Sequence, residues 1–402
     1  MVPKGWSESY LGEVVTYKKG YAFNSSLYAE EGIRIVRISD TTRDSIHSDN
    51  PVFIAGGNVE GLEQYSLFEN DIILSTVGSR PHLLDSMVGK AVKVPRSAHN
   101  SLLNQNLVKL IPKKTKITNE YLFSMLKKKE FIQFISNLVR GNANQVSITL
   151  ADLFKYKFIL PSLPEQKKIA QILSTWDKAI SVTEKLLTNS QQQKKALMQQ
   201  LLTGKKRLLD ENGVRFSGEW KQDVNLGSII NISKGVQINK NTLSEDGQFP
   251  VINGGIAPSG FTSEFNTDEN TITISEGGNS CGYVAFQKKS FWCGGHCYAV
   301  RKTALDLSFT FHLLKYNELK IMGLRVGSGL PNIQKKAIEA FTVNFPVTSV
   351  EQQKIAAVLS AADAEISTLE KKLACLKDEK KALMQQLLTG KRRVKVDEAV
   401  AE

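Results

Sequence analysis

The chain has 402 residues, of which 41% are hydrophobic and 23% charged, so it has an ordinary globular composition with room for roughly two to four domains. A net charge of +12 favours a polyanionic partner such as a nucleic acid. Four cysteines are too few for a disulfide framework, and we find neither an apolar leader nor a run of about 18 apolar residues. We therefore expect a soluble, cytoplasmic protein that makes no contact with a membrane.

Residues 1–160 form a first domain of mixed pattern. Short β-like runs at residues 33–38, 72–75, 88–94 and 107–111 are separated by polar turns. A helix is predicted over residues 119–138, towards the end of the domain.

A long amphipathic helix is predicted in the segment 161–205. Ser162 and Glu165 fit a capping box, and Gly204 suits the left-handed position after a helix end. Seam residues recur at alternating steps of four and three, the period of about 3.5 residues that is typical of a coiled coil. The main seam residues are Ile169, Leu173, Trp176, Ile180, Leu187, Leu197 and Leu201.

A linker at residues 206–216 leads to a second domain at residues 217–345. Strands are predicted at residues 271–275, 282–286 and 298–301, and a helix at residues 307–319. This domain repeats the first one faintly. Residues shared at similar spacing are Trp6 and Trp220, Leu11-Gly12 and Leu226-Gly227, and Lys19-Gly20 and Lys234-Gly235.

A second long helix is predicted in the segment 346–393, before a tail at residues 394–402. The string KALMQQLLTGK occurs at residues 195–205 and again at 381–391, so the helical segments are copies of each other. Thr348 and Glu351 repeat the capping box, and Gly390 repeats the helix stop. The second seam contains Ile355, Leu359, Ile366, Leu369, Leu373, Leu376, Leu383 and Leu387.

The two helices most simply pair with each other in an antiparallel coiled coil, although either could instead join a bundle core. The predicted fold is α+β, with two β-rich domains separated by this two-helix coiled coil in a pseudo-two-fold internal repeat. About 38 helical residues give a rod of about 57 Å, with one domain expected at each end.

Polar, glycine-containing loops in both domains carry residue types that neutralise phosphates or reach base edges. Such residues also occur in ordinary turns, so each is a candidate only. In the first domain the DNA-binding candidates are Lys18, Lys19, Arg80, His82, Arg140, Asn142, Asn144 and Gln145. In the second they are Lys234, Asn253, Asn279, His296, Arg325, Ser328 and Asn332.

No catalytic or cofactor motif is present: the chain lacks a phosphate-binding loop of the type GxxxxGK[ST], a GxGxxG fingerprint and an HExxH motif. Cys281, Cys293, His296 and Cys297 could close a tetrahedral zinc site, but their spacing is irregular, and buried or loop cysteines are the simpler interpretation. We expect no cofactor, no metal and no catalysis by this chain.

The duplicated helices resemble those of the specificity subunit of type I restriction–modification systems. The likeness is carried by residues 160–170, LPSLPEQKKIA, with residues 197–204, LMQQLLTG. It is repeated by residues 345–356, FPVTSVEQQKIA, with residues 383–390. It spans nearly the whole chain, strongly in the helices and generically in the domains between them.

The resemblance implies two target-recognition domains that bind a bipartite, asymmetric site on double-stranded DNA. It also implies docking of two methyltransferase subunits and, through them, of ATP-dependent restriction subunits. A coiled-coil scaffold that joins protein partners without reading DNA is the main alternative. A stand-alone nuclease or methyltransferase is less consistent with the missing motifs.

Overall fold

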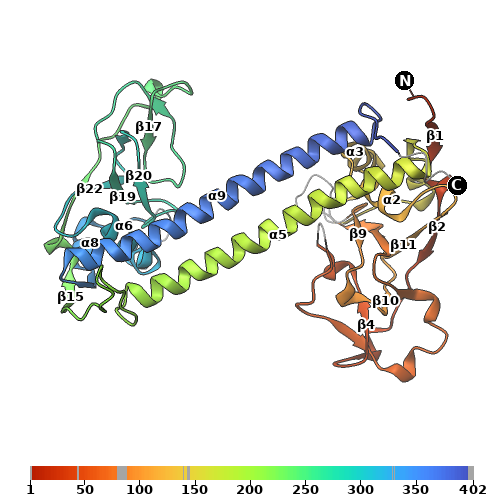
Figure 1. The fold of residues 1–402 in the computed structure, drawn as a ribbon, viewed down its shortest axis with the longest axis horizontal. Helices are drawn as coiled ribbons and strands as arrows, with labels where there is room; N and C mark the ends of the chain where they lie inside the picture. The colour runs from red at the N-terminus through yellow and green to blue at the C-terminus, as the bar shows by residue number, and fades with distance from the viewer. Residues whose placement is uncertain are drawn as a thin grey trace. The chain divides into compact units, whose positions relative to one another are not determined.

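The computed structural model describes residues 2–42, 45–78, 88–138, 140–142, 145–327, 329 and 331–396. Its contacts divide the chain into two compact units (Figure 1). Unit 1 contains Met1–Val182 and Leu373–Glu402, and unit 2 contains Thr183–Lys372. Each unit holds one β-rich head and part of each long helix. None of the helices in the described ranges has an apolar stretch that could cross a bilayer.

The central sheet of unit 1 is antiparallel. Its strand order is β2 (Val15–Lys19), β11 (Leu107–Pro112), β7 (Ile72–Ser75) and β9 (Ala91–Lys93). Strand β7 is buried along its whole length because both faces of the sheet are covered. Ile72 and Leu74 join a core cluster with the helices, whereas Ile73 joins a separate cluster on the other face.

Smaller strand groups complete unit 1. Strand β1 (Ser7–Tyr10) pairs with β14 (Lys157–Leu160), just before the first long helix. A second sheet has the order β3 (Tyr28–Ala29), β5 (Val52–Ile54), β4 (Ile33–Val36), β10 (Ser101–Leu103) and β6 (Ser66–Leu67). The third group has the order β12 (Arg140–Asn142), β13 (Gln145–Ser147) and β8 (Val77–Gly78). The strands predicted at residues 33–38 and 88–94 are shorter than expected, and Gly89, at φ +70°, separates Val88 from β9.

The prediction of a single helix over residues 119–138 is wrong. The structure has α2 (Asn119–Leu126) and α3 (Lys129–Leu138), with Lys127 as the C-cap between them. The break turns α3 so that Phe131 and Ile135 pack into the same core as Tyr121 of α2. Two short helices, α1 (Leu11–Val14) and α4 (Leu150–Leu153), flank this core.

Unit 2 repeats this plan. Its central sheet has the order β16 (Ile230–Lys234), β22 (Cys297–Thr303), β19 (Thr271–Ser275) and β20 (Val284–Gln287). Strand β15 (Trp220–Asn225) pairs with β23 (Thr342–Pro346), as β1 pairs with β14. Strand β17 (Phe249–Ile252) pairs with β18 (Phe261–Thr262) and, in parallel, with β21 (Trp292–Cys293), as β4 pairs in parallel with β10. The faint sequence repeat is therefore a repeat of structure.

The helix predicted at residues 307–319 is also divided, into α6 (Leu307–Tyr316) and α7 (Glu318–Met322). Asn317 ends α6: its side-chain amide donates to the carbonyl of Leu313 at 2.9 Å. A further short helix, α8 (Lys335–Ala340), lies before β23.

The long helices are α5 (Leu163–Leu201) and α9 (Ser349–Leu387). They begin directly after the predicted caps Ser162 and Thr348. After each helix a glycine adopts the left-handed conformation, at φ +71° for Gly204 and φ +70° for Gly390. The predicted helix starts and stops are confirmed.

Parts of α5 and α9 lie side by side in each unit and run in opposite directions (Figure 1). In unit 1, Ile169 and Leu173 share a core cluster with Leu387, and Lys380 forms an ion pair with Asp177. In unit 2, Leu201 shares a core cluster with Ile355 and Leu359. Lys194 pairs there with Asp363, and Ser190 Oγ donates to Glu365 at 2.9 Å. All the predicted seam residues are buried or half-buried.

Candidate nucleic-acid interface

The residues that follow the first strand of each central sheet form hydrogen bonds with the two ends of a three-residue turn from another part of the head. In the first head, residues 1–160, the backbone N–H of Gly20 donates to Leu107 O at 3.0 Å and that of Tyr21 to Leu103 O at 2.9 Å. In the second head, residues 217–345, Gly235 and Val236 make the matching bonds. These go to Cys297 O and Cys293 O, both at 2.8 Å. The turns 104–106 and 294–296 are therefore held in the same way.

A third segment joins each turn. The N–H of Thr76 donates to Asn106 O at 3.3 Å, and the N–H of Glu276 donates to His296 O at 2.9 Å. A fourth segment follows, because Ile148 N donates to Thr76 O at 3.0 Å and Ile333 N to Glu276 O at 2.8 Å. We call residues 18–21, 76–78, 104–106 and 145–148 the first loop cluster. The second loop cluster comprises residues 234–237, 276–278, 294–296 and 331–333.

The glycine of each Lys-Gly pair is required by close backbone approach. A Cβ on Gly20 would lie 1.9 Å from the carbonyl oxygen of Asn104, and a Cβ on Gly235 would lie 2.3 Å from that of Cys293. Any other residue would push the turn away from the strand. The repeated Lys-Gly pair thus marks a shared structural requirement of both loop clusters.

In the first loop cluster, the candidate Lys18 is half-buried. Its ammonium donates to Gln64 Oε1 and lies 4.8 Å from the centre of the Tyr65 ring. Tyr21, whose ring is tilted by 51° against that of Tyr65 with ring centres 5.2 Å apart, extends this basic and aromatic surface. The candidate Lys19 is exposed and lies at the end of β2. Tyr21, Gln64 and Tyr65 were missed because nothing local distinguishes them from ordinary loop residues.

The other candidates of the first head are only partly placed. Arg140, Asn142 and Gln145 lie on the β12–β13 hairpin, where Asn142 pairs with Gln145. Strand β13 pairs in turn with β8, so this hairpin lies beside the segment that follows Thr76. Arg80, His82 and Asn144 lie outside the described residues.

The second loop cluster brings three candidates together around an acidic residue that was not predicted. Glu276 Oε1 accepts from Lys234 Nζ at 2.5 Å, and Glu276 Oε2 lies 3.4 Å from His296 Nδ1. The side-chain oxygen of Asn253 accepts from the backbone N–H of His296 at 3.0 Å. Burial, and then the negative charge of Glu276, raises the pKa of Tyr298 to about 12, so its hydroxyl stays protonated 3.3 Å from Glu276 Oε1.

The remaining candidates of the second head lie near this group. Asn332 bridges to Gly277 and Val326 by backbone pairing and is exposed. Asn279 and Arg325 are exposed loop residues. Ser328 lies outside the described residues.

Three of the four cysteines are packing residues of the second head, and the fourth, Cys375, is exposed on α9. Cys293 and Cys297 are buried in a small cluster on one face of the central sheet, and Cys281 is buried in the main core on the other. The thiol of Cys281 donates to the carbonyl of Glu276 at 2.9 Å. In the described part of the chain no three His, Cys, Asp or Glu side chains are grouped as metal ligands.

The start of each long helix carries a buried Glu-Gln pair. Glu165 accepts hydrogen bonds from Trp6 Nε1 at 3.1 Å and from two nitrogens of Arg393 at 2.6 and 2.8 Å. Burial raises the pKa of Glu165, but the hydrogen bonds outweigh burial and hold that pKa below its ordinary value. Glu351 accepts from Arg207 Nε and Nη2 at 2.5 and 2.7 Å. Each junction thus ties a helix start to the arginine that follows the other helix.

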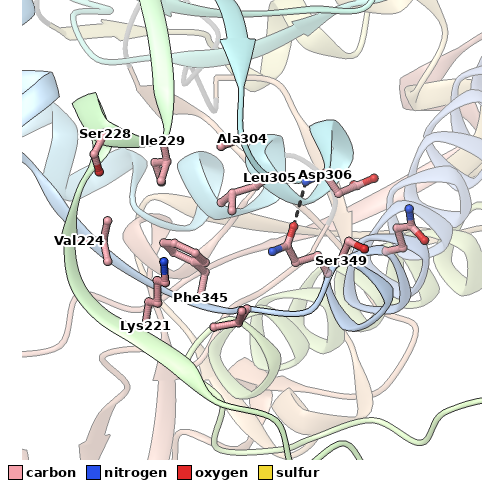
Figure 2. A pocket seen from close by; sticks show the side chains of 12 residues that line it. Lys221, Val224, Ser228, Ile229, Ala304, Leu305, Asp306, Phe345 and Ser349 are labelled. Carbon is pink, nitrogen blue, oxygen red and sulfur yellow. Dashed lines mark hydrogen bonds between the residues drawn. The ribbon is translucent and has the colours of Figure 1, made fainter.

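The glutamine of each pair ties its helix to the head. Gln166 Oε1 accepts at 2.9 Å from the N–H of Thr118, the N-cap of α2. Gln352 Oε1 accepts at 2.9 Å from the N–H of Asp306, the N-cap of α6 (Figure 2). The side-chain amide of Gln166 also donates to the carbonyls of Lys116 and Pro161. That of Gln352 donates to the carbonyl of Pro346.

A pocket of about 660 Å³ lies beside the second junction (Figure 2). The β15–β23 ribbon contributes Lys221 and Phe345 to its wall, and α9 contributes Ser349. The pocket lies where the β15–β23 ribbon of the head meets the start of α9.

Comparison with known proteins identifies the family. The family described as type I restriction modification DNA specificity domain matches residues 3–189 and 218–377. A putative type I restriction enzyme specificity subunit of Methanocaldococcus jannaschii is 27% identical over 98% of this chain and 95% of its own length.

Two further relatives support this assignment. A putative type I specificity subunit of Mycoplasma pneumoniae is 37% identical, but the match covers 36% of this chain and only 39% of that relative. The crystal structure of a type I restriction–modification S subunit from M. genitalium has the same fold, with a TM-score of 0.70 over 96% of both chains at 19% identity. Since the family match includes both heads and most of both long helices, the chain belongs to the family of type I restriction–modification specificity subunits.

Proposed function

We propose that the chain is the DNA-reading subunit of a type I restriction–modification complex. Each head binds one half of a bipartite target on double-stranded DNA, and the halves differ in sequence. The chain carries no catalysis and no cofactor of its own and works in the cytoplasm. It docks two methyltransferase subunits and, through them, the restriction subunits.

The observation that carries this proposal is the pair of loop clusters. Both are built on the same backbone hydrogen bonds, yet they present Thr76 and Asn106 in one head and Glu276 and His296 in the other. A shared scaffold with different exposed side chains is what two readers of different sequences require. The net charge of +12 favours the same partner.

In this proposal the functional domains are residues 1–160 and 217–345, and the helical segments 161–205 and 346–393 form an antiparallel coiled-coil spacer. The linker is 206–216 and the tail 394–402. The candidate contacts are those named from the sequence, together with Tyr21, Gln64, Tyr65 and Glu276 of the loop clusters. The spacer sets the distance between the half-sites and provides the docking surface for the methyltransferases.

Methylome sequencing of cells that express the chain with its methyltransferase subunits tests the proposal directly. We expect one bipartite, asymmetric methylated motif. Lengthening both long helices by two turns should change the spacer between the half-sites and leave the half-site bases unchanged. A change in the half-site bases would contradict the role of the helices.

Electrophoretic mobility shifts on random duplex DNA separate this function from a protein scaffold. DNA affinity should fall steeply as salt rises, because phosphate contacts release counterions. Absence of binding at low salt would favour the scaffold.

A further inference from the structure

The second loop cluster contains a carboxylate, that of Glu276, although the partner expected for this cluster, DNA, is a polyanion. Glu276 occupies the same position as Thr76 in the first head, because both backbone N–H groups donate to the three-residue turn and both carbonyls accept from the fourth segment. The two heads therefore differ in charge at this position. A carboxylate beside DNA phosphates is repelled, so a contribution to phosphate binding does not explain it.

The carboxylate of Glu276 is covered by side chains that are themselves largely exposed. Lys234 and Tyr298 both donate to Oε1, whereas Oε2 has His296 Nδ1 at 3.4 Å. The side chain of Glu276 is 13% exposed, but those of Lys234 and His296 are 52% and 61% exposed. The two covering side chains can therefore swing outward without disturbing the core.

The neighbouring side chains of Asn253 and Tyr298 are already engaged within the protein, so they are not free to contact a base. Asn253 uses its oxygen to hold the backbone of His296, and the Tyr298 hydroxyl is buried against Ile333 O at 3.1 Å. Among the described residues of the second loop cluster, Glu276 thus has the only carboxylate. In the major groove a carboxylate matches the N4 amino group of cytosine, which is a donor.

We propose that Glu276 reads a cytosine in the half-site bound by the second head. Lys234 moves from the carboxylate to a DNA phosphate, and the freed carboxylate accepts a hydrogen bond from the cytosine N4 amino group. This inference rests on the proposed function, since it requires that the second head binds its half-site through this cluster. The first head, with Thr76 at the same position, reads a different pattern.

Selection from a random duplex DNA library with the purified full chain tests the inference. The wild-type protein should require a cytosine at one position of the second half-site. Glu276→Gln keeps the reach of the side chain but replaces the acceptor by an amide, which pairs with adenine. We expect the preference at that position to move from cytosine to adenine by at least about fivefold.

Glu276→Asp separates charge from reach. It retains the carboxylate but shortens the side chain, so the cytosine preference should weaken while the salt dependence of binding stays as in the wild type. On random duplex DNA, where no cytosine opens the pair, Glu276→Gln should instead make the salt dependence steeper, by up to about 0.9 in the slope of log K against log salt, because Lys234 is released from its partner.

Glu264→Gln is the matched control, since Glu264 is an exposed carboxylate of the same head outside the cluster. It should leave both half-sites unchanged. The first half-site reports in every variant that the chain is intact.

The inference is overturned if the wild-type second half-site contains no cytosine, or if neither Glu276 variant changes that half-site. It is also overturned if both Glu276 variants lose all positions of that half-site together, because Glu276 would then only support the fold. A wild-type chain that selects no bipartite sequence contradicts the proposed function itself.

Discussion

The helix junctions and the loop clusters are both duplicated, but in opposite ways. At the junctions the repeat keeps the side chains: a tryptophan, a buried Glu-Gln pair and an arginine occur at both. In the loop clusters the repeat keeps the backbone hydrogen bonds and changes the side chains. Shared side chains indicate a shared structural task, whereas a shared backbone with different side chains fits the two different half-sites of the proposed function.

The two junctions also differ in one bond. Trp6 Nε1 donates to Glu165, whereas Trp220 Nε1 is buried without a hydrogen-bond partner in the described structure. Arg207 is also less exposed than Arg393, at 19% against 42%. The less an arginine is exposed to water, the more free energy is lost when its carboxylate is removed. The second junction should therefore depend more strongly on its ion pair.

The largest expected effect is the loss of a junction glutamate. We expect Glu351→Ala to destabilise unit 2 by about 3 kcal/mol and Glu165→Ala to destabilise unit 1 by about 2 kcal/mol, because each leaves a partly buried arginine unpaired. Urea unfolding of the full chain measures both values. Equal losses, or a larger loss for Glu165→Ala, would show that the exposure of the arginine does not set the cost.

A smaller effect is expected from the junction glutamines. Gln166 makes three hydrogen bonds and Gln352 makes two, as counted from the bonds to Thr118, Lys116 and Pro161 and those to Asp306 and Pro346. We expect about 2 kcal/mol of destabilisation for Gln166→Ala and about 1 kcal/mol for Gln352→Ala. The same unfolding measurement applies, with Gln171→Ala, an exposed position on α5, as the control. The reverse order would mean that the buried bonds at the two junctions are not equivalent.

The sequence predicted the junctions better than the loop clusters. Helix caps, helix stops and the seam period are local signals, so the sequence predicted the ends of α5 and α9 to within a few residues. The divisions at Lys127 and Asn317 were missed because each is imposed by packing of a second short helix on a shared core. The copied Glu-Gln pair was visible as a motif, but its partners lie far along the chain.

The candidate contacts were chosen by residue type, and this choice favoured basic and amide side chains over acidic ones. Lys234, Asn253 and His296 do lie together. Glu276 was not considered, because an acidic residue does not fit a simple phosphate-binding surface. Its link to Lys234 joins positions 42 residues apart, which no local pattern reveals.

Phosphate binding by the two clusters should differ in a measurable way. The side chain of Lys19 is exposed and makes no hydrogen bond or ion pair with the described residues, whereas that of Lys234 is paired with Glu276. We expect Lys19→Ala to reduce the salt slope of DNA binding by about 0.9 and Lys234→Ala to reduce it by less. Titrations of random duplex DNA at several salt concentrations give both slopes. A larger change for Lys234→Ala would indicate that its ion pair with Glu276 does not compensate its charge.

The smallest expected effect is the pH dependence of the first junction. Because the pKa of Glu165 is held below its ordinary value of 4.5, unfolding raises that pKa, and the unfolded chain takes up the proton first as the solution is acidified. The stability that Glu165 contributes is therefore complete above pH 4.5 and is lost as the pH falls through the lower pKa of the folded state. In Glu165→Gln this contribution is absent at every pH, so the difference in unfolding free energy between wild type and variant should shrink between neutral pH and about pH 3. Glu264→Gln, which removes an exposed carboxylate, should show a smaller change over the same range. A difference that stays constant with pH would mean that Glu165 stabilises the junction by packing rather than by its charge, and the comparison with Glu351 would then depend on shape alone.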